Sequence, residues 1–135
     1  MSRVTIVVAM HDGLSTALIL AASRFIDVTK VIDLPLLADI RLEEYRKSFL
    51  KILEEHQEVL VLTDILVGAC SVALLPLLQN KQFALVTGAN LTMLIDSIEY
   101  CDELNATELM KYVKQSSIND IKNVDDFYKE FNNGK

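Results

Sequence analysis

The stretch Val4-Thr-Ile-Val-Val-Ala-Met-His11-Asp-Gly13 joins an uncharged apolar run to an abrupt polar end. A run of mostly β-branched or small apolar residues closed by a turn signal is typical of a strand buried on both faces of a parallel sheet. His11 therefore follows the carboxyl end of a central strand, the edge where open α/β sheets hold ligands and reactive groups. The stretch predicts both a strand and a candidate site.

The chain downstream of Gly13 alternates between helical and strand patterns. Asp39 and Asn90 stand where helix caps are expected, and Asn105-Ala-Thr-Glu108 has the form of a capping box. We expect further strands at residues 28–34, 59–63 and 83–87, and helices at residues 14–24, 42–53, 68–78, 91–98 and 105–115.

This alternation predicts one α/β domain over residues 1–135 with an open, doubly wound and mainly parallel sheet. Right-handed crossovers and the commonest small topology give the strand order 2-1-3-4, with a crevice between the carboxyl ends of the first and third strands. His11 ends the first of these strands and Asp64 ends the third, so the two should face each other. In the weaker tail, residues 116–135, the spacing of Ile118, Ile121 and Val124 predicts a short edge strand.

Composition narrows the class of protein. The 135 residues carry a net charge of −6 and no cluster of Lys and Arg, which argues against nucleic acid or an anionic membrane as the main partner. The longest uncharged run, residues 65–80, is shorter than the roughly 20 apolar residues of a membrane span. No signal peptide pattern is present, and Cys70 and Cys101 lack metal or redox spacing, so we expect a cytoplasmic protein with two reduced thiols and no metal.

A histidine that carries a phosphoryl group needs one exposed, unprotonated ring nitrogen and an acceptor that orients the other nitrogen. Asp64 can supply this acceptor. The phosphoryl oxygens also need backbone N–H donors, for which Gly68 would allow a close approach. The residues expected to hold the phosphate are Asp12, Gly13, Leu66, Val67, Gly68, Ala69 and Cys70.

Each residue taken alone is also compatible with a structural role. A histidine after a strand can simply face solvent, and an aspartate there can be a turn or cap residue. His56, at the polar end of a helix, suits the helix dipole. The two cysteines fit small core positions. The helix at residues 68–78 is apolar on nearly every side, which suggests a subunit contact.

Three motifs in order resemble the mannose/fructose-type enzyme IIA domains of the bacterial phosphoenolpyruvate-dependent sugar phosphotransferase system. They are Met-His11-Asp-Gly-Leu-Ser-Thr-Ala, Leu-Val-Leu-Thr-Asp64-Ile-Leu-Val-Gly-Ala-Cys-Ser and Gly88-Ala-Asn-Leu-Thr-Met-Leu94, and the resemblance runs from Val4 to about Val124.

The resemblance implies a histidine phosphoryl carrier. His11 would accept the group from the phosphocarrier HPr and pass it to an enzyme IIB partner, with Asp64 assisting, and the membrane sugar permease components would act later. No cofactor is implied. Family members are commonly dimers that exchange a C-terminal strand, which here would be the antiparallel edge strand at residues 118–124.

The motifs depart from the family pattern at three places. Residues 67–70 read Val-Gly-Ala-Cys instead of Gly-Gly-Ser-Pro, which removes a glycine and a hydroxyl, although backbone donors remain. Asp12 replaces the usual glycine after the histidine, and Thr92 replaces a proline. A carboxylate at position 12 would repel a phosphoryl group by an amount that depends on its direction.

Two other functions remain open at the level of sequence. A receiver-like signalling domain would be phosphorylated on Asp64 with Mg²⁺ bound, although no Lys follows a fifth parallel strand. A regulatory module could keep the IIA fold without efficient transfer, as the altered residues 67–70 suggest. The sequence names neither the sugar nor the IIB partner.

Overall fold

The computed structural model describes residues 3–79 and 82–133. Its centre is a four-stranded parallel sheet in the order β2-β1-β3-β4. The strands are β1 (Thr5–Ala9), β2 (Ile32–Asp33), β3 (Val59–Thr63) and β4 (Phe83–Val86). The predicted fold class and strand order are therefore confirmed.

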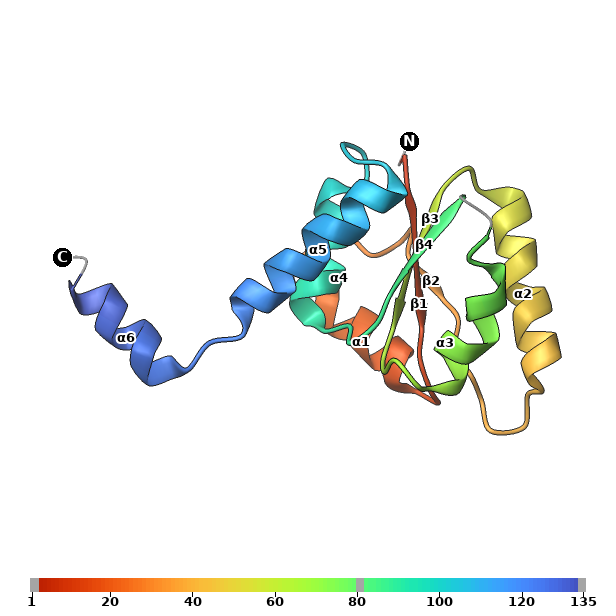
Figure 1. Cartoon of the computed structure of the whole chain (residues 1–135), viewed down its shortest axis with the longest axis horizontal. Helices are drawn as coiled ribbons and strands as arrows, with labels where there is room; N and C mark the ends of the chain where they lie inside the picture. Colours follow the sequence, from red (N-terminus) through yellow and green to blue (C-terminus); the bar gives the residue numbers. More distant parts are fainter. Residues whose placement is uncertain (1–2, 80–81, 134–135) are drawn as a thin grey trace.

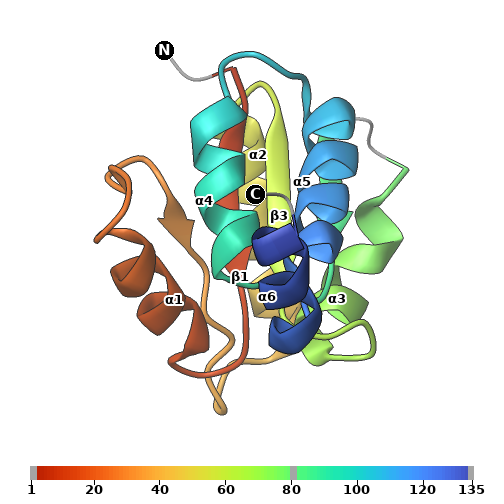
Figure 2. The ribbon, with the colours of Figure 1, turned by 90° about the vertical axis from the view of Figure 1, so that its left-hand side faces the viewer.

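Helices cover both faces of the sheet in a three-layer arrangement (Figures 1 and 2). One face carries α1 (Leu14–Ala22), α4 (Leu91–Tyr100) and α5 (Ala106–Asp120). The other carries α2 (Leu42–Glu55), α3 (Ala69–Leu74) and the short 3₁₀ helix η1 (Leu75–Leu77). A last helix, α6 (Val124–Asn133), projects away from these layers.

The two central strands are buried because both of their faces are covered. Successive side chains of a strand point to opposite faces. Ile6 and Val8 accordingly pack in the core with α4 and α5, whereas Val7 and Ala9 pack in the core with α2 and α3. Every residue of β3 is buried. This explains why the sequence of these strands is a continuous apolar run and not an alternation.

The bounds of β2, α2 and α3 differ from those predicted from the sequence. The expected strand at residues 28–34 is reduced to Ile32–Asp33, because β2 is an edge strand paired only with β1. Asp39 does not cap α2, whose N-cap residue is Arg41 with extended backbone. The expected helix at residues 68–78 is divided into α3 and η1, and Pro76, which has no N–H to continue an α-helix, lies in η1.

The expected C-terminal edge strand is not formed. Residues 118–120 instead complete α5, and α6 begins at Val124. Two side-chain contacts favour the helical path: Gln115 donates to Asn119 one turn later, and the Thr92 hydroxyl donates to Asp120 at 2.5 Å. Residues 134 and 135 of the expected tail lie outside the described residues.

Within residues 3–79 and 82–133, no helix has both the length and the apolar character needed to cross a bilayer.

Candidate functional site

His11 and Asp64 meet at the carboxyl edge of the sheet, as their positions after β1 and β3 predict. These strands are direct neighbours in register, with Ala9 opposite Thr63, so the chain ends of both strands emerge side by side. The His11 ring nitrogen Nδ1 lies 2.7 Å from Asp64 Oδ2, and the His11 backbone N–H donates to the same oxygen at 3.0 Å. One carboxylate therefore holds both the backbone and the ring of the histidine.

Two independent contacts assign the ring tautomer. Asp64 can only accept from Nδ1, so Nδ1 carries the proton. On the other side of the ring, the Ala69 backbone N–H donates to Nε2 at 3.3 Å, which requires a lone pair there. Neutral His11 thus has an unprotonated Nε2, and its side chain is 37% exposed. A nucleophilic nitrogen is held at the surface.

Hydrogen bonds keep Asp64 ionised. Burial of this carboxyl by itself would raise its pKa, but donation from the His11 backbone, the His11 ring and the Ile65 N–H outweighs burial and lowers the pKa. The Ile65 N–H bonds to Oδ1 at 2.9 Å, so both carboxylate oxygens are engaged. A fixed negative charge can therefore stabilise positive charge on the ring.

Gly68 brings the following loop against the histidine. A Cβ atom added at Gly68 would lie 2.8 Å from His11 Cε1 and 2.8 Å from Ile65 Cγ1. The backbone of Gly68 is ordinary, with φ −81° and ψ 159°, so space and not conformation requires glycine here. This close approach places the Ala69 N–H at the ring.

The other predicted phosphate-binding residues differ in whether their backbone N–H groups are free of hydrogen bonds within the fold and in how exposed they are. The Asp12 N–H donates to the Leu36 carbonyl, and the Gly68 N–H donates to Ile65 in a turn, so these two amides are used within the fold. Leu66 and Val67 form the exposed tip of that turn. Gly13 is exposed at the N-cap position of α1.

Asp12 has a left-handed backbone, with φ 52°. This conformation favours glycine. The following residue, Gly13, has φ −88° and does not need to be glycine for its conformation. Asp12 is therefore the residue of this turn that bears backbone strain.

Cys70 is buried beneath the site. Burial raises the pKa of its thiol. Donor atoms of His11, Asp64 and Cys70 lie within 4.8 Å of one another, a set of nitrogen, oxygen and sulfur that could attract a thiophilic ion. An ion would have to break the hydrogen bond between His11 and Asp64 and remove the proton of a buried thiol. The hydrogen bond between His11 and Asp64 therefore explains why these groups lie close together, without a metal ion.

Three positioning residues were missed at the level of sequence. The Ser71 hydroxyl donates to the Ile65 carbonyl at 2.9 Å and lies 2.9 Å from the Thr63 hydroxyl, which ties the loop to β3. Gly88, with φ 70°, donates its N–H to the Asp64 carbonyl. A buried hydroxyl in an otherwise apolar helix was the available signal for Ser71.

The candidate site lies apart from the best-formed hollow in the part of the chain that the structure describes. That hollow, about 690 Å³, opens at the amino ends of the strands and is lined by residues such as Arg3, Lys30 and His56. Neither His11 nor Asp64 lines it. A reactive ring on an open edge suits a group delivered by another protein more than an enclosed small molecule.

The model of the PTS system fructose IIA component family, EIIA-man, matches residues 5–114. The chain belongs to this family. The match contains His11, Asp64 and the loop between β3 and α3, and it ends before the last turns of α5.

Solved structures agree with the family fold. Phosphotransferase component EIIA from Streptococcus agalactiae is 19% identical with a TM-score of 0.83, covering 90% of this chain and 98% of its own. A PTS IIA protein associated with the fucose utilization operon of Streptococcus pneumoniae is 25% identical with a TM-score of 0.76, covering 94% and 97%. A mannose/sorbose specific IIA subunit from Enterococcus faecalis is 21% identical with a TM-score of 0.77, covering 90% and 94%. A search of curated proteins gave no match.

Proposed function

We propose that this IIA-family protein is a phosphoryl carrier in which Nε2 of His11 accepts a phosphoryl group from one protein and passes it to another. The observation that carries the proposal is the contact between His11 Nδ1 and Asp64 Oδ2 at 2.7 Å, which leaves Nε2 with a lone pair at the exposed edge of the sheet. The membership of the chain in the EIIA-man family supports the same reaction.

The transfer step can be written with all bonds balanced. The Nε2 lone pair forms a bond to phosphorus as the bond between phosphorus and the donor nitrogen of phosphorylated HPr breaks. Nδ1 keeps its proton, so the phosphorylated ring carries a positive charge that ionised Asp64 stabilises. In the second half, a nucleophile of the enzyme IIB partner forms the new bond to phosphorus as the bond between Nε2 and phosphorus breaks. The electron pair of that bond returns to Nε2, and the ring becomes neutral again.

The Ala69 N–H is the donor placed for the phosphoryl oxygens. It lies 3.3 Å from Nε2, and a phosphoryl group on this nitrogen would come between them and accept its hydrogen bond. We propose that Asp12, Gly13, Leu66, Val67, Gly68 and Cys70 form the surrounding wall of the phosphate site, without side-chain hydroxyl donors at residues 67–70.

Exposed apolar side chains near the His11 ring could contact the proteins that donate and accept the phosphoryl group. Ile65, Leu66 and Val67 are 59%, 73% and 84% exposed, directly after Asp64. Such a concentration on a loop is a common feature of protein contact surfaces. We propose HPr as the donor, an enzyme IIB as the acceptor and indirect coupling to membrane sugar permease components, with the protein acting in the cytoplasm as a homodimer of single-domain subunits.

Phosphoryl uptake tests the assignment. The protein is incubated with phosphoenolpyruvate, enzyme I and HPr, and its mass and phosphorylated residue are measured by mass spectrometry. We expect one acid-labile, base-stable phosphate on wild type and on His56→Ala, the matched control for the second histidine, and none on His11→Ala. Uptake by His11→Ala would contradict the proposal, as would failure of folded wild type to react.

The receiver-like alternative gives the opposite chemical stability. Phosphorylation of Asp64 would need Mg²⁺ and give a base-labile acyl phosphate. Because both oxygens of Asp64 already accept hydrogen bonds from His11 and Ile65, the geometry favours an orienting carboxylate over a nucleophilic one. Asp64→Ala should therefore slow uptake by at least about tenfold, and the residual phosphate should remain on histidine.

A further inference from the structure

Two hydroxyl groups at the start of α1 bind a carboxylate that is separate from Asp64. The Ser15 hydroxyl donates to Asp33 Oδ1 and the Thr16 hydroxyl donates to Asp33 Oδ2, each at 2.5 Å. These are short, charge-assisted hydrogen bonds, and a carboxylate near the amino end of a helix is also favoured by the helix dipole. Ser15 is fully buried, whereas Thr16 is exposed. Asp33 of β2 therefore holds two adjacent residues in the first turn of α1.

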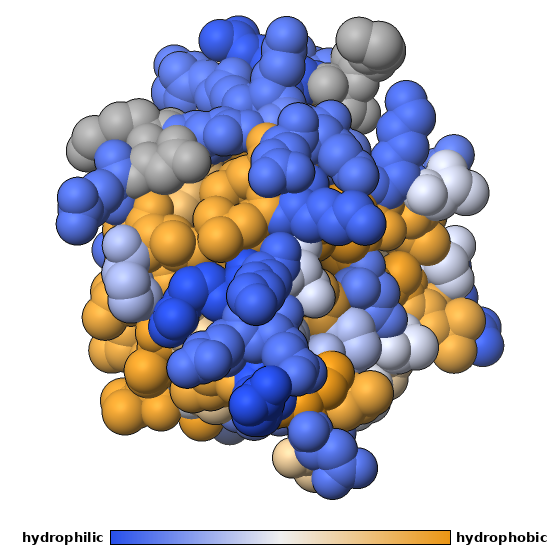
Figure 3. Space-filling view, turned by 90° about the vertical axis from the view of Figure 1, so that its right-hand side faces the viewer, coloured by the Kyte–Doolittle hydropathy of each residue, from blue (hydrophilic) through white to orange (hydrophobic). Residues whose placement is uncertain are grey.

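The end of β2 gives Asp33 a fixed position. Asp33 pairs with Val8 of β1, and the next residue, Leu34, donates its N–H to the Val8 carbonyl at 2.9 Å. From α2, the buried Tyr45 donates its hydroxyl to the Leu34 carbonyl at 2.6 Å. Figure 3, which views the side of α2, shows a hydrophilic band between areas of hydrophobic surface, in agreement with burial of only one face of α2. Hydrogen bonds from the central strand and from α2 thus fix the backbone that carries Asp33.

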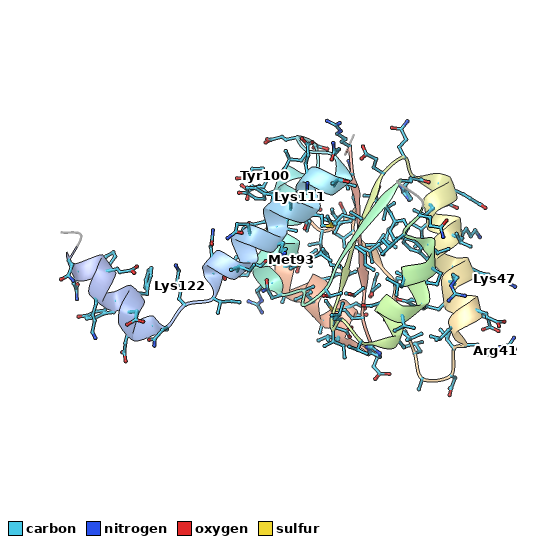
Figure 4. The ribbon with its side chains drawn as sticks, in the orientation of Figure 1. Arg41, Lys47, Met93, Tyr100, Lys111 and Lys122 are labelled. Atoms are coloured by element: carbon cyan, nitrogen blue, oxygen red, sulfur yellow. The ribbon has the colours of Figure 1, made fainter. Side chains whose placement is uncertain are left out.

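Apolar packing holds the later part of α1. Leu18 and Ile19 pack against the same core as Met93 of α4, which Figure 4 labels. The start of α1 is different, because its N-cap residue, Gly13, makes no side-chain cap hydrogen bond and Leu14 is 50% exposed. The contacts with Asp33 supply an attachment that capping and apolar packing leave out.

The first turn of α1 continues directly from the candidate site. It follows His11, Asp12 and Gly13, and the Leu14 N–H donates back to the His11 carbonyl at 3.2 Å. Asp12 has the strained, left-handed backbone, and its N–H donates to the Leu36 carbonyl at 2.9 Å. Such a backbone persists only where the surrounding structure fixes it. Leu36 fixes the turn on the side of the sheet, and α1 fixes it on the other side.

We propose that Asp33 is a positioning residue for phosphoryl transfer. Through the Ser15 and Thr16 hydroxyls it fixes the start of α1, and so it holds the strained turn of residues 11–13 where Nε2 of His11 accepts the phosphoryl group. Asp33 acts on the turn and not on the reacting atoms, so its loss should change the geometry of the site and leave binding of the donor protein intact. The inference rests on the proposed function of His11 and adds to it a second carboxylate with a different role.

Kinetics with one pair of variants test this role. Thr16→Val keeps the size of an exposed side chain and removes its hydroxyl donor, whereas Thr16→Ser keeps the hydroxyl. The rate of phosphoryl uptake is measured against the concentration of phosphorylated HPr. Because a small displacement of a reacting group slows a reaction strongly, Thr16→Val should lower kcat by about fivefold and change KM by less than about twofold. Thr16→Ser should restore kcat to within about twofold of wild type.

Removal of the carboxylate itself should have a larger effect. Asp33→Ala should lower kcat by about tenfold or more, with KM again within about twofold of wild type. Asp27→Ala is the matched control and should keep the wild-type kcat. Asp27 is also an exposed carboxylate that accepts a hydrogen bond, from the Thr29 N–H at 2.9 Å, but it lies at the amino ends of the strands.

Two kinetic results would overturn the inference. One is a rise in KM at unchanged kcat, because Asp33 would then act on binding of the donor protein. The other is the same kcat for Thr16→Val and Thr16→Ser, because the hydroxyl donor would then be without effect. The Thr16 pair decides the question if Asp33→Ala fails to fold.

Hydrogen exchange examines the turn without any phosphoryl donor. The Ala17 N–H donates to the Gly13 carbonyl at the start of α1, at 3.0 Å. The Ser23 N–H donates to the Ile19 carbonyl at the end of this helix, also at 3.0 Å. In Thr16→Val, exchange at Ala17 should be faster than in wild type by about tenfold, and exchange at Ser23 should be unchanged. Equal acceleration at both amides would indicate a general loss of stability and would contradict the positioning role.

The outcomes separate this inference from the carrier function. If wild type takes up phosphate on His11 and both Thr16→Val and Asp33→Ala react with the wild-type kcat, the inference fails and the carrier function stands. If folded wild type takes up no phosphate on His11, the carrier function fails and the role of Asp33 in transfer fails with it. Exchange at Ala17 still reports in that case whether the Thr16 hydroxyl fixes the start of α1.

Discussion

At the residue scale, the candidate site depends on two direct hydrogen bonds of the His11 ring, one with Asp64 and one with the Ala69 N–H. The carboxylate fixes the proton on Nδ1, and the Ala69 N–H identifies Nε2 as the free base. Because Gly68 allows the loop to touch the ring, even one methyl group added at residue 68 should disturb both the loop and the ring.

The substitution Gly68→Ala tests this contact. Its added Cβ would lie 2.8 Å from His11 Cε1 and from Ile65 Cγ1, so the loop must move away from the ring. We expect phosphoryl uptake to slow by about tenfold or more, with a loss of about 1–3 kcal/mol in the free energy of unfolding. Gly13→Ala is the control for the free energy of unfolding only, since nothing lies within 4 Å of its added Cβ. Equal uptake by Gly68→Ala and wild type would argue against a role for the close approach.

The lowered pKa of Asp64 gives a pH-dependent stability. A carboxyl whose pKa is lower in the folded chain than its ordinary 3.8 stabilises the fold fully above that value, and the contribution is lost as the pH falls through the folded pKa. We expect Asp64→Asn to cost about 1 kcal/mol at pH 6 to 7. This difference from wild type should shrink below about pH 4, as measured by urea unfolding. A difference that grows on acidification would refute the sign.

At the scale of elements, side-chain caps fix where α4 and α5 begin, whereas α1, α2 and α3 begin without a side-chain cap hydrogen bond. The Asn105 side chain accepts from the Glu108 N–H at 2.8 Å, while Glu108 accepts from the Asn105 N–H at 3.0 Å. This reciprocal pair starts α5, the helix that packs against β3 and β4.

Removal of this cap should destabilise the whole fold, because α5 packs on the sheet through Leu109 and Val113. Asn105→Ala should lower the free energy of unfolding by about 1 kcal/mol, as judged from denaturant midpoints at constant slope. Gln115→Ala, in the exposed middle of the same helix, should change it by less than about 0.5 kcal/mol. Equal effects of the two substitutions would mean that capping is not the cause.

At the scale of the whole molecule, the sheet separates two cores, and the site lies at the edge where both end. Phe49 on α2 is fully buried and packs edge-on against Phe83 of β4, with ring centroids 5.0 Å apart. This contact joins a helix of one layer to an edge strand of the sheet.

Truncation of the Phe49 side chain should destabilise the whole domain. Phe49→Ala should cost about 3–5 kcal/mol, a large part of the roughly 5–15 kcal/mol that stabilises a typical domain. Phe25→Ala, at a site that is 67% exposed, should cost less than about 0.5 kcal/mol. Thermal and denaturant unfolding of both variants would measure the difference, and a mild effect at Phe49 would show that the α2 layer is not coupled to the sheet.

The sequence by itself determined the parallel sheet, its strand order and the meeting of His11 with Asp64. Two-sided burial leaves a continuous apolar run in β1 and β3, and neighbouring parallel strands end at one edge. The caps at Asn90 and Asn105 were likewise readable, because they depend on residues three apart in the chain.

Only the tertiary structure decided which backbone amides face the ring. It also decided that residues 118–120 complete a helix and do not form an edge strand. The amides of Asp12 and Gly68 are used by Leu36 and Ile65, and the Thr92 hydroxyl bonds to Asp120 at the end of α5. These outcomes depend on contacts between segments far apart in the chain or on the conformation of a single turn. No local pattern of residue types fixes such contacts, because they exist only after the layers have packed.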